Sequence, residues 1–474
     1  MGTGTTRCVT MRVIPALLAL AWAGGAQAAA FQLLEQNASG IGNAYAGTAA
    51  SAENASTVFF NPAGMAFLSS KRQVSLGLDA VKPTAKFSNG STTPSFALPP
   101  SATLPTVRPN SVGGNGGDAG DWAFIPNFYL TVPINERLNF GLGVGAPFGL
   151  KTEYDNGWAG RYHALKSEVK TINLNPSISF KVNEKLAVGG GLNYQRFEAE
   201  LTNAVNYGLV LASAAGNAST PAAVRAAIAP LAGTANLDGV GKVSGNDTGW
   251  GWNLGAMYQV SPDMRLGVAY RSAIKYHVTG TASFSTPATG NAAAQAVMAT
   301  ATADGPVKLD IKVPDSLTFS VAQRLDERWE MLGDLQWTGW AKIREIAIYR
   351  SDGTLLSKLD EQWRNTWRVA LGANYKLNEK VKLRMGVAYD QTPVKNELRH
   401  PSLPDNDRTW LSFGVRYQLS PSSVIDAGYA HLFVKKASIH DDGGSTTNAV
   451  LKGTLDGSYK NSVDILGVQY TMSF

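Results

Sequence analysis

The C-terminal segment of the chain is the feature that most constrains its fold. Between Ser462 and Phe474 apolar and polar side chains alternate strictly, as in a β-strand with one apolar and one polar face. Bacterial outer-membrane β-barrels commonly end in such a strand with an aromatic last residue. We therefore predict that Phe474 is the signal recognised by the barrel assembly machinery. The apolar face carries Leu466, Val468, Tyr470, Met472 and Phe474.

The N-terminal end has the features of a secretory signal peptide. Two arginines precede the apolar stretch Val13–Trp22, and Ala26-Gln27-Ala28 matches a cleavage site of small residues. We expect residues 1–28 to be the signal and the mature chain to begin at Ala29. The only cysteine, Cys8, would leave with the signal, so the mature chain is predicted to have neither disulfide nor thiolate chemistry.

The composition differs from that of a large soluble domain. Charged residues are 16% of the chain, compared with about 25% in soluble domains. The chain holds 49 glycines, 11 Trp, 16 Tyr and 17 Phe, and no apolar run after the signal is long enough for a transmembrane helix. The net charge of +6 is scattered along the sequence, so no nucleic-acid partner is predicted. This composition favours a transmembrane β-barrel.

Three further segments repeat the alternation: Trp367–Leu377, Val381–Asp390 and Leu411–Leu419. Their second face carries Lys and Arg, and a charge facing hydrocarbon would cost about 2–4 kcal/mol at the bilayer midplane. We therefore expect that face to point into a lumen. A soluble sandwich would instead bury the apolar face in its core, and the strands taken singly are compatible with both folds.

The connections between strands favour the barrel. Short polar connections alternate with long ones, as the periplasmic turns and external loops of outer-membrane barrels do. Six short and seven long connections predict an all-β fold, a fourteen-stranded antiparallel transmembrane barrel over residues 71–474. The short ones are Ile134–Arg137, Asn183–Lys185, Ser261–Asp263, Asp326–Arg328, Asn378–Lys380 and Ser420–Ser423; the long ones are roughly Lys82–Asp121, Gly149–Ser167, Asn203–Asp247, Ser283–Gly305, Tyr349–Gln362, Val394–Arg408 and Ser438–Tyr459.

Residues 29–70 show no strand alternation. They are rich in small residues, and Asn61-Pro62-Ala63 has the form of an N-cap followed by proline at the first helical position. A disordered tail is one interpretation, but apolar side chains such as Phe31 and Phe60 are too numerous for a solvated tail. We predict a small helical plug, or hatch, inside the barrel.

Several short motifs in order along the mature chain resemble the FadL/TodX family of outer-membrane transporters. The N-terminal part contains Ala29-Ala30-Phe31-Gln32-Leu33, Gly40-Ile41-Gly42-Asn43-Ala44-Tyr45-Ala46-Gly47 and Asn61-Pro62-Ala63, the hallmark of that family's hatch. The barrel part contains Ile125-Pro126-Asn127, Gly249-Trp250-Gly251-Trp252-Asn253, Tyr270-Arg271-Ser272, Trp367-Arg368-Val369-Ala370-Leu371-Gly372 and Pro404-Asp405-Asn406-Asp407-Arg408-Thr409-Trp410-Leu411-Ser412. The family's fold is a fourteen-stranded barrel closed by a hatch, in agreement with the strand count.

The resemblance implies passive uptake of long-chain fatty acids or other hydrophobic compounds, without catalysis. Substrate would first meet an apolar groove between two external loops, then a tighter site beside the hatch, and leave sideways through a gap at a kinked third strand. In this sequence the groove residues would be Val224, Ile228, Leu231, Val297 and Met298, and the inner site would include Phe31, Phe60 and Lys358. The exit would lie at Pro147, Phe148 and Gly149, since proline and glycine interrupt strand pairing.

The identity of the substrate stays open from sequence. Lys358 matches a lysine of the family's inner site, but Asn203 stands where the family has the partner arginine. Arg196 is an alternative partner that the weak alternation of its strand does not place, so a fatty acid and a neutral hydrocarbon both stay open as substrates. An open porin for polar solutes is the nearest rival, and an adhesin a more distant one. The five histidines show no catalytic or metal-ligand spacing, so no enzyme activity, metal or cofactor is predicted. We also expect the barrel to contact outer-membrane lipid and the protein to be a monomer.

Overall fold

The computed structural model describes residues 30–68, 71–94, 111–443 and 452–474. The predicted signal peptide, residues 1–28, lies outside these ranges. Within them, no helix combines the length and the apolar character needed to cross a membrane.

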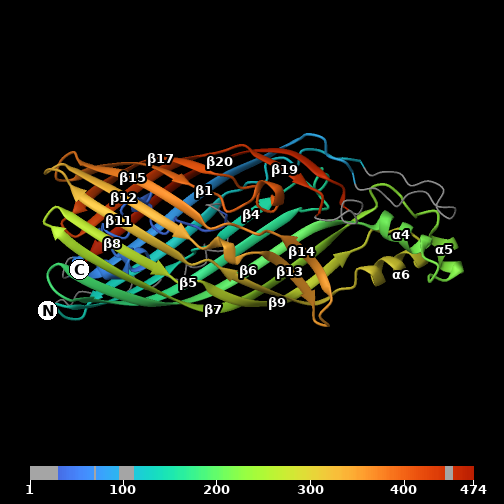
Figure 1. The fold of residues 1–474 in the computed structure, drawn as a ribbon, viewed down its shortest axis with the longest axis horizontal. Coiled ribbons are helices and arrows are strands. Elements are labelled where there is room, and N and C mark those ends of the chain that lie inside the picture. Colours follow the sequence, from blue (N-terminus) through green and yellow to red (C-terminus); the bar gives the residue numbers. More distant parts are fainter. Residues whose placement is uncertain (1–29, 69–70, 95–110, 444–451) are drawn as a thin grey trace, which may run out of the picture.

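The strands form one antiparallel sheet that closes on itself (Figure 1). Fourteen strands span the barrel wall in succession, and we call each of them a stave. The first, β1, pairs with the last, β20. The predicted fourteen-stranded barrel is therefore confirmed. In order around the wall the staves are β1 (Gln73–Asn89), β2 (Ala123–Pro133), β3 (Leu138–Gly145), β5 (Lys166–Lys181), β6 (Leu186–Asn206), β7 (Asp238–Ser261), β8 (Met264–Arg271), β11 (Ser316–Arg324), β12 (Trp329–Thr338), β15 (Thr366–Lys376), β16 (Val381–Asp390), β17 (Arg408–Ser420), β18 (Ser423–Val434) and β20 (Leu455–Ser473).

The alternation in the sequence corresponds to the two faces of this wall. On β15, Val369 and Leu371 point outward and are 48% and 57% exposed, while Arg368 and Ala370 point inward and are 4% and 1% exposed. A row of exposed apolar side chains around the outside of the barrel suits contact with lipid. A soluble sandwich would instead bury that row in its core. The charged face lines the lumen, as expected.

Short turns gather at the end of the barrel that holds the C-terminus, and long connections at the opposite end (Figure 1). At the end with the long connections, several staves are longer than the sequence predicted. For example, β1 reaches Asn89, whereas the sequence predicted that a loop begins at Lys82. Strands outside the membrane need no apolar outer face, so their alternation is weak. The continuing strands are β4 (Gly149–Glu153), β9 (Ile274–Ser285), β10 (Gly305–Val313), β13 (Glu345–Arg350), β14 (Leu355–Asp360) and β19 (Ala437–Asp441).

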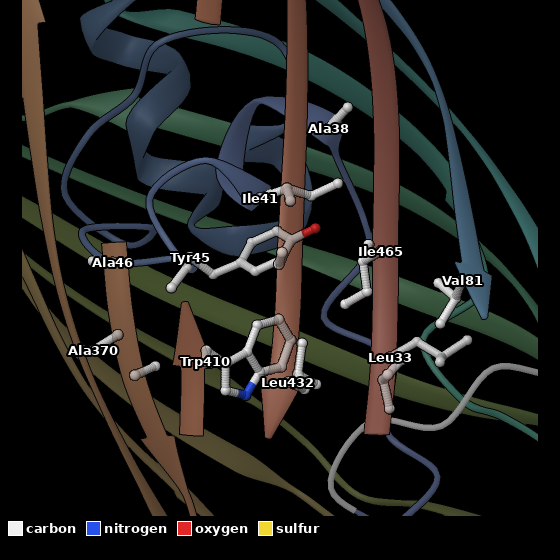
Figure 2. Close-up of a cluster of buried hydrophobic side chains, with 14 of the residues drawn as sticks. Leu33, Ala38, Ile41, Tyr45, Ala46, Val81, Ala370, Trp410, Leu432 and Ile465 are labelled. Carbon is white, nitrogen blue, oxygen red and sulfur yellow. The ribbon is translucent and has the colours of Figure 1, made fainter. Parts of the chain in front are cut away.

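Residues 30–68, which we call the hatch, pack inside the barrel. They form α2 (Ala38–Ile41), α3 (Thr57–Phe60) and the 3-10 helix η2 (Pro62–Phe67). Asn61 caps η2 by accepting a hydrogen bond from the Ala63 backbone N–H, as its motif predicted. Figure 2 shows Ile41 and Tyr45 against Trp410 and Leu432 of the wall, all fully buried. The core of the protein is therefore the contact between hatch and wall.

The third stave is interrupted. β3 pairs with both β2 and β5, whereas β4, its continuation beyond residues 146–148, pairs only with β5. Residues 123–127 of β2 consequently have strand partners on the β1 side alone. Glycines along β3 and the proline at position 147, which cannot donate to a strand partner, account for the break.

Candidate functional site

A narrow pocket lies between the hatch and the wall at the level of the interrupted stave. Its lining combines Leu34, Phe59 and Phe60 of the hatch with Phe148 and Arg271 of the barrel, among others. The free space is about 50 Å³, room for a few water molecules at most. Typical ligand pockets offer about 300–1,000 Å³, so an acyl chain can enter only if part of the lining moves.

The first part of the hatch is held by an aromatic cage. Phe31 is 4% exposed, and its ring centroid lies 5.7 Å from that of Phe148, 5.0 Å from that of Trp340 and 5.8 Å from that of Trp363. Trp340 and Trp363 come from connections on either side of β13 and β14. Phe60 lines the pocket directly, and Phe31 adjoins it through Phe148.

The hatch also pairs with the interrupted stave through backbone hydrogen bonds. The Leu33 N–H donates to the Pro147 carbonyl at 2.9 Å, and the Gly149 N–H donates to the Phe31 carbonyl at 2.8 Å. The side-chain amide of Gln36 donates to the Ala146 carbonyl at 2.8 Å. The break in the wall is thus hydrogen-bonded to hatch residues that line or adjoin the pocket.

Two arginines line the pocket, Arg368 buried and Arg271 partly buried. Arg271 donates to the Phe59 carbonyl at 2.9 Å and lies over the Phe59 ring at 4.1 Å. Arg368 donates to the Ala44 carbonyl and lies over Trp410 at 5.2 Å. Among the described residues neither guanidinium forms an ion pair. Neither arginine was predicted as a site residue, although both occur in the quoted family motifs on lumen-facing positions.

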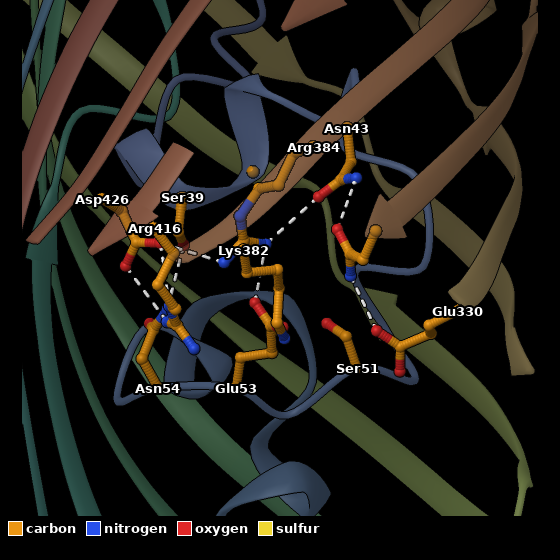
Figure 3. Close-up of polar contacts among 12 residues, drawn as sticks. Ser39, Asn43, Ser51, Glu53, Asn54, Glu330, Lys382, Arg384, Arg416 and Asp426 are labelled. Atoms are coloured by element: carbon orange, nitrogen blue, oxygen red, sulfur yellow. Dashed lines mark hydrogen bonds and ion pairs between the residues drawn. The ribbon is translucent and has the colours of Figure 1, made fainter. Parts of the chain in front are cut away.

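The rest of the hatch is fixed to the wall by a network of charged groups (Figure 3). Glu53 contacts Lys382 at 2.9 Å and Arg384 at 2.7 Å. Arg384 in turn contacts Asp426 at 2.9 Å and the side-chain carbonyl of Asn43 at 3.2 Å. Breaking such a buried network by removing one partner is typically costly. These contacts favour a stationary hatch body below a displaceable N-terminal segment.

The structure does not bring Lys358 to the inner pocket. It lies on β14, where its ammonium group contacts Glu345 at 3.0 Å and Asp360 at 3.1 Å, and its side chain is 40% exposed. It lines a separate external cavity together with His400 and Asp441. A half-exposed lysine already paired with two carboxylates has little reason to bind a third.

The predicted groove residues lie on or beside the external helices α4 (Tyr207–Gly216), α5 (Ala222–Ile228) and α6 (Ala292–Ala301), at the right of Figure 1. Ile228 and Met298 are fully buried in one cluster, and Val224, Leu231 and Val297 pack against it. These five residues thus pack against one another, and their role as a ligand groove stays a prediction. Helices isolated from the barrel have no other apolar surface to cover, so they bury these side chains against one another.

Glu35 gives the hatch a predicted pH response. Burial raises its pKa from 4.5 to about 7, against the lowering effect of backbone N–H groups and of Arg408. The buried carboxyl prefers its neutral form, so the docked segment should lose stability as pH rises from 4.5 to 7, by about 3 kcal/mol in all. We expect Glu35→Gln to increase hydrogen-exchange protection of the Leu33 amide at pH 8 and to leave it nearly unchanged at pH 4.5. Equal effects at both pH values would contradict this assignment.

Comparison with known proteins gives consistent results. The family model described as outer membrane protein transport protein (OMPP1/FadL/TodX) matches residues 19–474. Outer membrane protein P1 of Haemophilus influenzae is 34% identical over 87% of this chain and 88% of its own length. The long-chain fatty acid transport protein of Escherichia coli is 28% identical over 89% of this chain and 90% of its own length.

Solved structures match most of the chain. A Pseudomonas aeruginosa FadL homologue has a TM-score of 0.80 at 26% identity, covering 94% of this chain and all of the homologue (100%). The Ralstonia pickettii toluene transporter TbuX has a TM-score of 0.61 at 21% identity, covering 93% of this chain and 100% of its own. At that identity the second match speaks for the fold alone.

Proposed function

The chain belongs to the OMPP1/FadL/TodX family of outer-membrane transport proteins, and we propose that it takes up long-chain fatty acids. The single observation that carries the choice of substrate is the pair of arginines, Arg271 and Arg368, in a pocket lined by aromatic and polar side chains, among them Asp334. A guanidinium that has no carboxylate partner can form a charge-assisted hydrogen bond with a fatty-acid carboxylate. A neutral aromatic hydrocarbon would need no such group.

The names of relatives point the same way. The Escherichia coli relative is called a long-chain fatty acid transport protein. The structural neighbours named for toluene or monoaromatic hydrocarbons are 18–21% identical to this chain, too distant to indicate a substrate. The arginine pair also takes the place of the lysine and arginine that the sequence resemblance suggested, since Lys358 lies elsewhere.

We propose a three-step route. A fatty acid that reaches the lumen displaces the segment around Phe31 from its aromatic cage, which enlarges the pocket. The displaced segment gives up its backbone bonds to Pro147 and Gly149, and the break beside β2 becomes an opening. The acyl chain then passes sideways between β2 and β4 toward the lipid, with Phe148 at the threshold. Uptake is passive in this scheme, because the affinity of the acyl chain for lipid is enough to drive its binding and release.

The hatch explains why an open porin is the weaker alternative. Residues 30–68 occupy the lumen and are largely buried against the wall. A porin for polar solutes would need a continuous aqueous passage, whereas the pocket here holds about 50 Å³ of free space. Displacement of a short apolar segment suits an apolar substrate better than a hydrated one.

The arginines provide the test of the substrate. We expect Arg271→Gln and Arg368→Gln each to weaken fatty-acid binding about 10- to 100-fold, the scale of one hydrogen bond to a charged group. Binding of toluene, measured in parallel on the detergent-solubilised protein, should stay within about twofold of the unmodified protein, because toluene makes no charge-assisted bond.

Lys358→Gln serves as the matched control, since it removes a positive charge from an external site. It should leave fatty-acid binding unchanged. If the arginine variants bind fatty acid normally, or lose fatty acid and toluene equally, the arginines do not read a carboxylate and the proposed substrate is wrong.

A further inference from the structure

Three side chains that are far apart in the sequence meet among the external connections. His163 follows β4, His400 lies between β16 and β17, and Asp441 is the last residue of β19. One ligand atom from each lies within 4.8 Å of the other two. His163 Nδ1 is 3.0 Å from Asp441 Oδ2, and His400 Nε2 is 3.6 Å from the same oxygen.

These separations suit a metal centre. Bonds of 2.0–2.2 Å in a tetrahedral site place neighbouring ligand atoms about 3.4 Å apart. The His163 side chain is 1% exposed, and its Nε2 has no hydrogen-bond partner. A cation between His163 and Asp441 would be held by Nδ1, the imidazole nitrogen that faces the carboxylate.

His400 Nδ1 accepts a hydrogen bond from the Ser402 backbone N–H at 3.2 Å and lies 3.0 Å from the Ser402 hydroxyl. In the neutral ring the proton therefore sits on Nε2, which faces Asp441, and a metal ion bound there would displace it. His400 and Asp441 line an external cavity of about 300 Å³, which gives a cation access. Lys452 lines the same cavity and opposes cation binding. Two imidazoles nevertheless favour Zn²⁺, Ni²⁺ or Cu²⁺ over Ca²⁺ or Mg²⁺.

We propose that His163, His400 and Asp441 bind one divalent transition-metal ion, with water in the fourth position. The ion would tie together three connections from different parts of the barrel and so stiffen its external end. The alternative, an ion pair between His163 and Asp441, would involve only two of the three residues and would leave His400 without a role. The proposal is independent of the transported substrate.

The test uses the full-length protein in detergent, stripped with a chelator and titrated with Zn²⁺. We expect one equivalent to bind to the unmodified protein, and binding to be lost in His400→Ala and in Asp441→Asn. His277→Ala is the matched control, because His277 forms an exposed pair with Asp310 at 2.7 Å on other strands; it should keep the full equivalent. Heat-dependent electrophoretic mobility reports whether each barrel is folded.

A second measurement needs no variant. Co²⁺ bound at the site should give the intense visible absorption of a four-coordinate centre, and Zn²⁺ should remove that absorption at one equivalent. No stoichiometric binding to the unmodified protein, or equal binding by the His400→Ala and Asp441→Asn variants, would overturn the proposal.

Discussion

Deletion of residues 30–68 should convert the barrel into an open pore. The hatch fills the lumen, and its removal would leave a fourteen-stranded wall whose inner face is lined with polar and charged groups. Barrels only slightly larger hold aqueous channels, so single-channel conductance in planar bilayers should rise by about tenfold or more. The expected effect is the largest of any change to this protein, because it removes the whole obstruction.

A loop deletion provides the control. Removal of α5, residues 222–228, changes the external end without touching the hatch, and conductance should stay low. If conductance stays low after removal of residues 30–68, with the barrel folded by electrophoretic mobility, the hatch is not what closes the pore. High conductance in the intact protein would instead favour the porin alternative.

Phe31→Ala should release the N-terminal segment of the hatch. Truncation of a buried phenylalanine typically costs about 3–5 kcal/mol, and here the loss falls on the docked segment alone, because Phe31 leaves the cage when the segment undocks. The undocked population should increase by about two orders of magnitude or more. Hydrogen exchange at the Leu33 and Gly149 amides, which bond across the interrupted stave, would report this increase directly.

Phe87→Ala is the matched control for that experiment. Phe87 is 3% exposed and has aromatic neighbours at similar distances, 5.7 Å to Trp158 and 5.3 Å to Tyr459, but it lies on β1. Its truncation should destabilise the external end and leave exchange at Leu33 and Gly149 unchanged. Equal effects of the two substitutions would show that the amides respond to general loosening and not to the cage.

The sequence alone determined the fold and much of its internal plan. Alternation over Ser462–Phe474 and the regular succession of short and long connections fixed the barrel and its strand number, because both are local properties of each strand. The cap at Asn61 and the glycines and proline before Gly149 act locally as well, and each lies in the structure at a helix start or a strand break. Membrane insertion imposes these patterns stave by stave, so they can be read without knowing which staves face each other.

Only the tertiary structure decided which side chains share a site. Alternation places Arg368 in the lumen, yet whether it meets the pocket depends on the stagger of the strands and on the path of the hatch. Lys358 matched a family position but lies in the β13–β14 hairpin beyond the membrane, where alternation carries no information. The apolar residues of α5 and α6 pack together, and His163, His400 and Asp441 converge from three connections. Such meetings are set by contacts across hundreds of residues, and no local pattern in the chain records them.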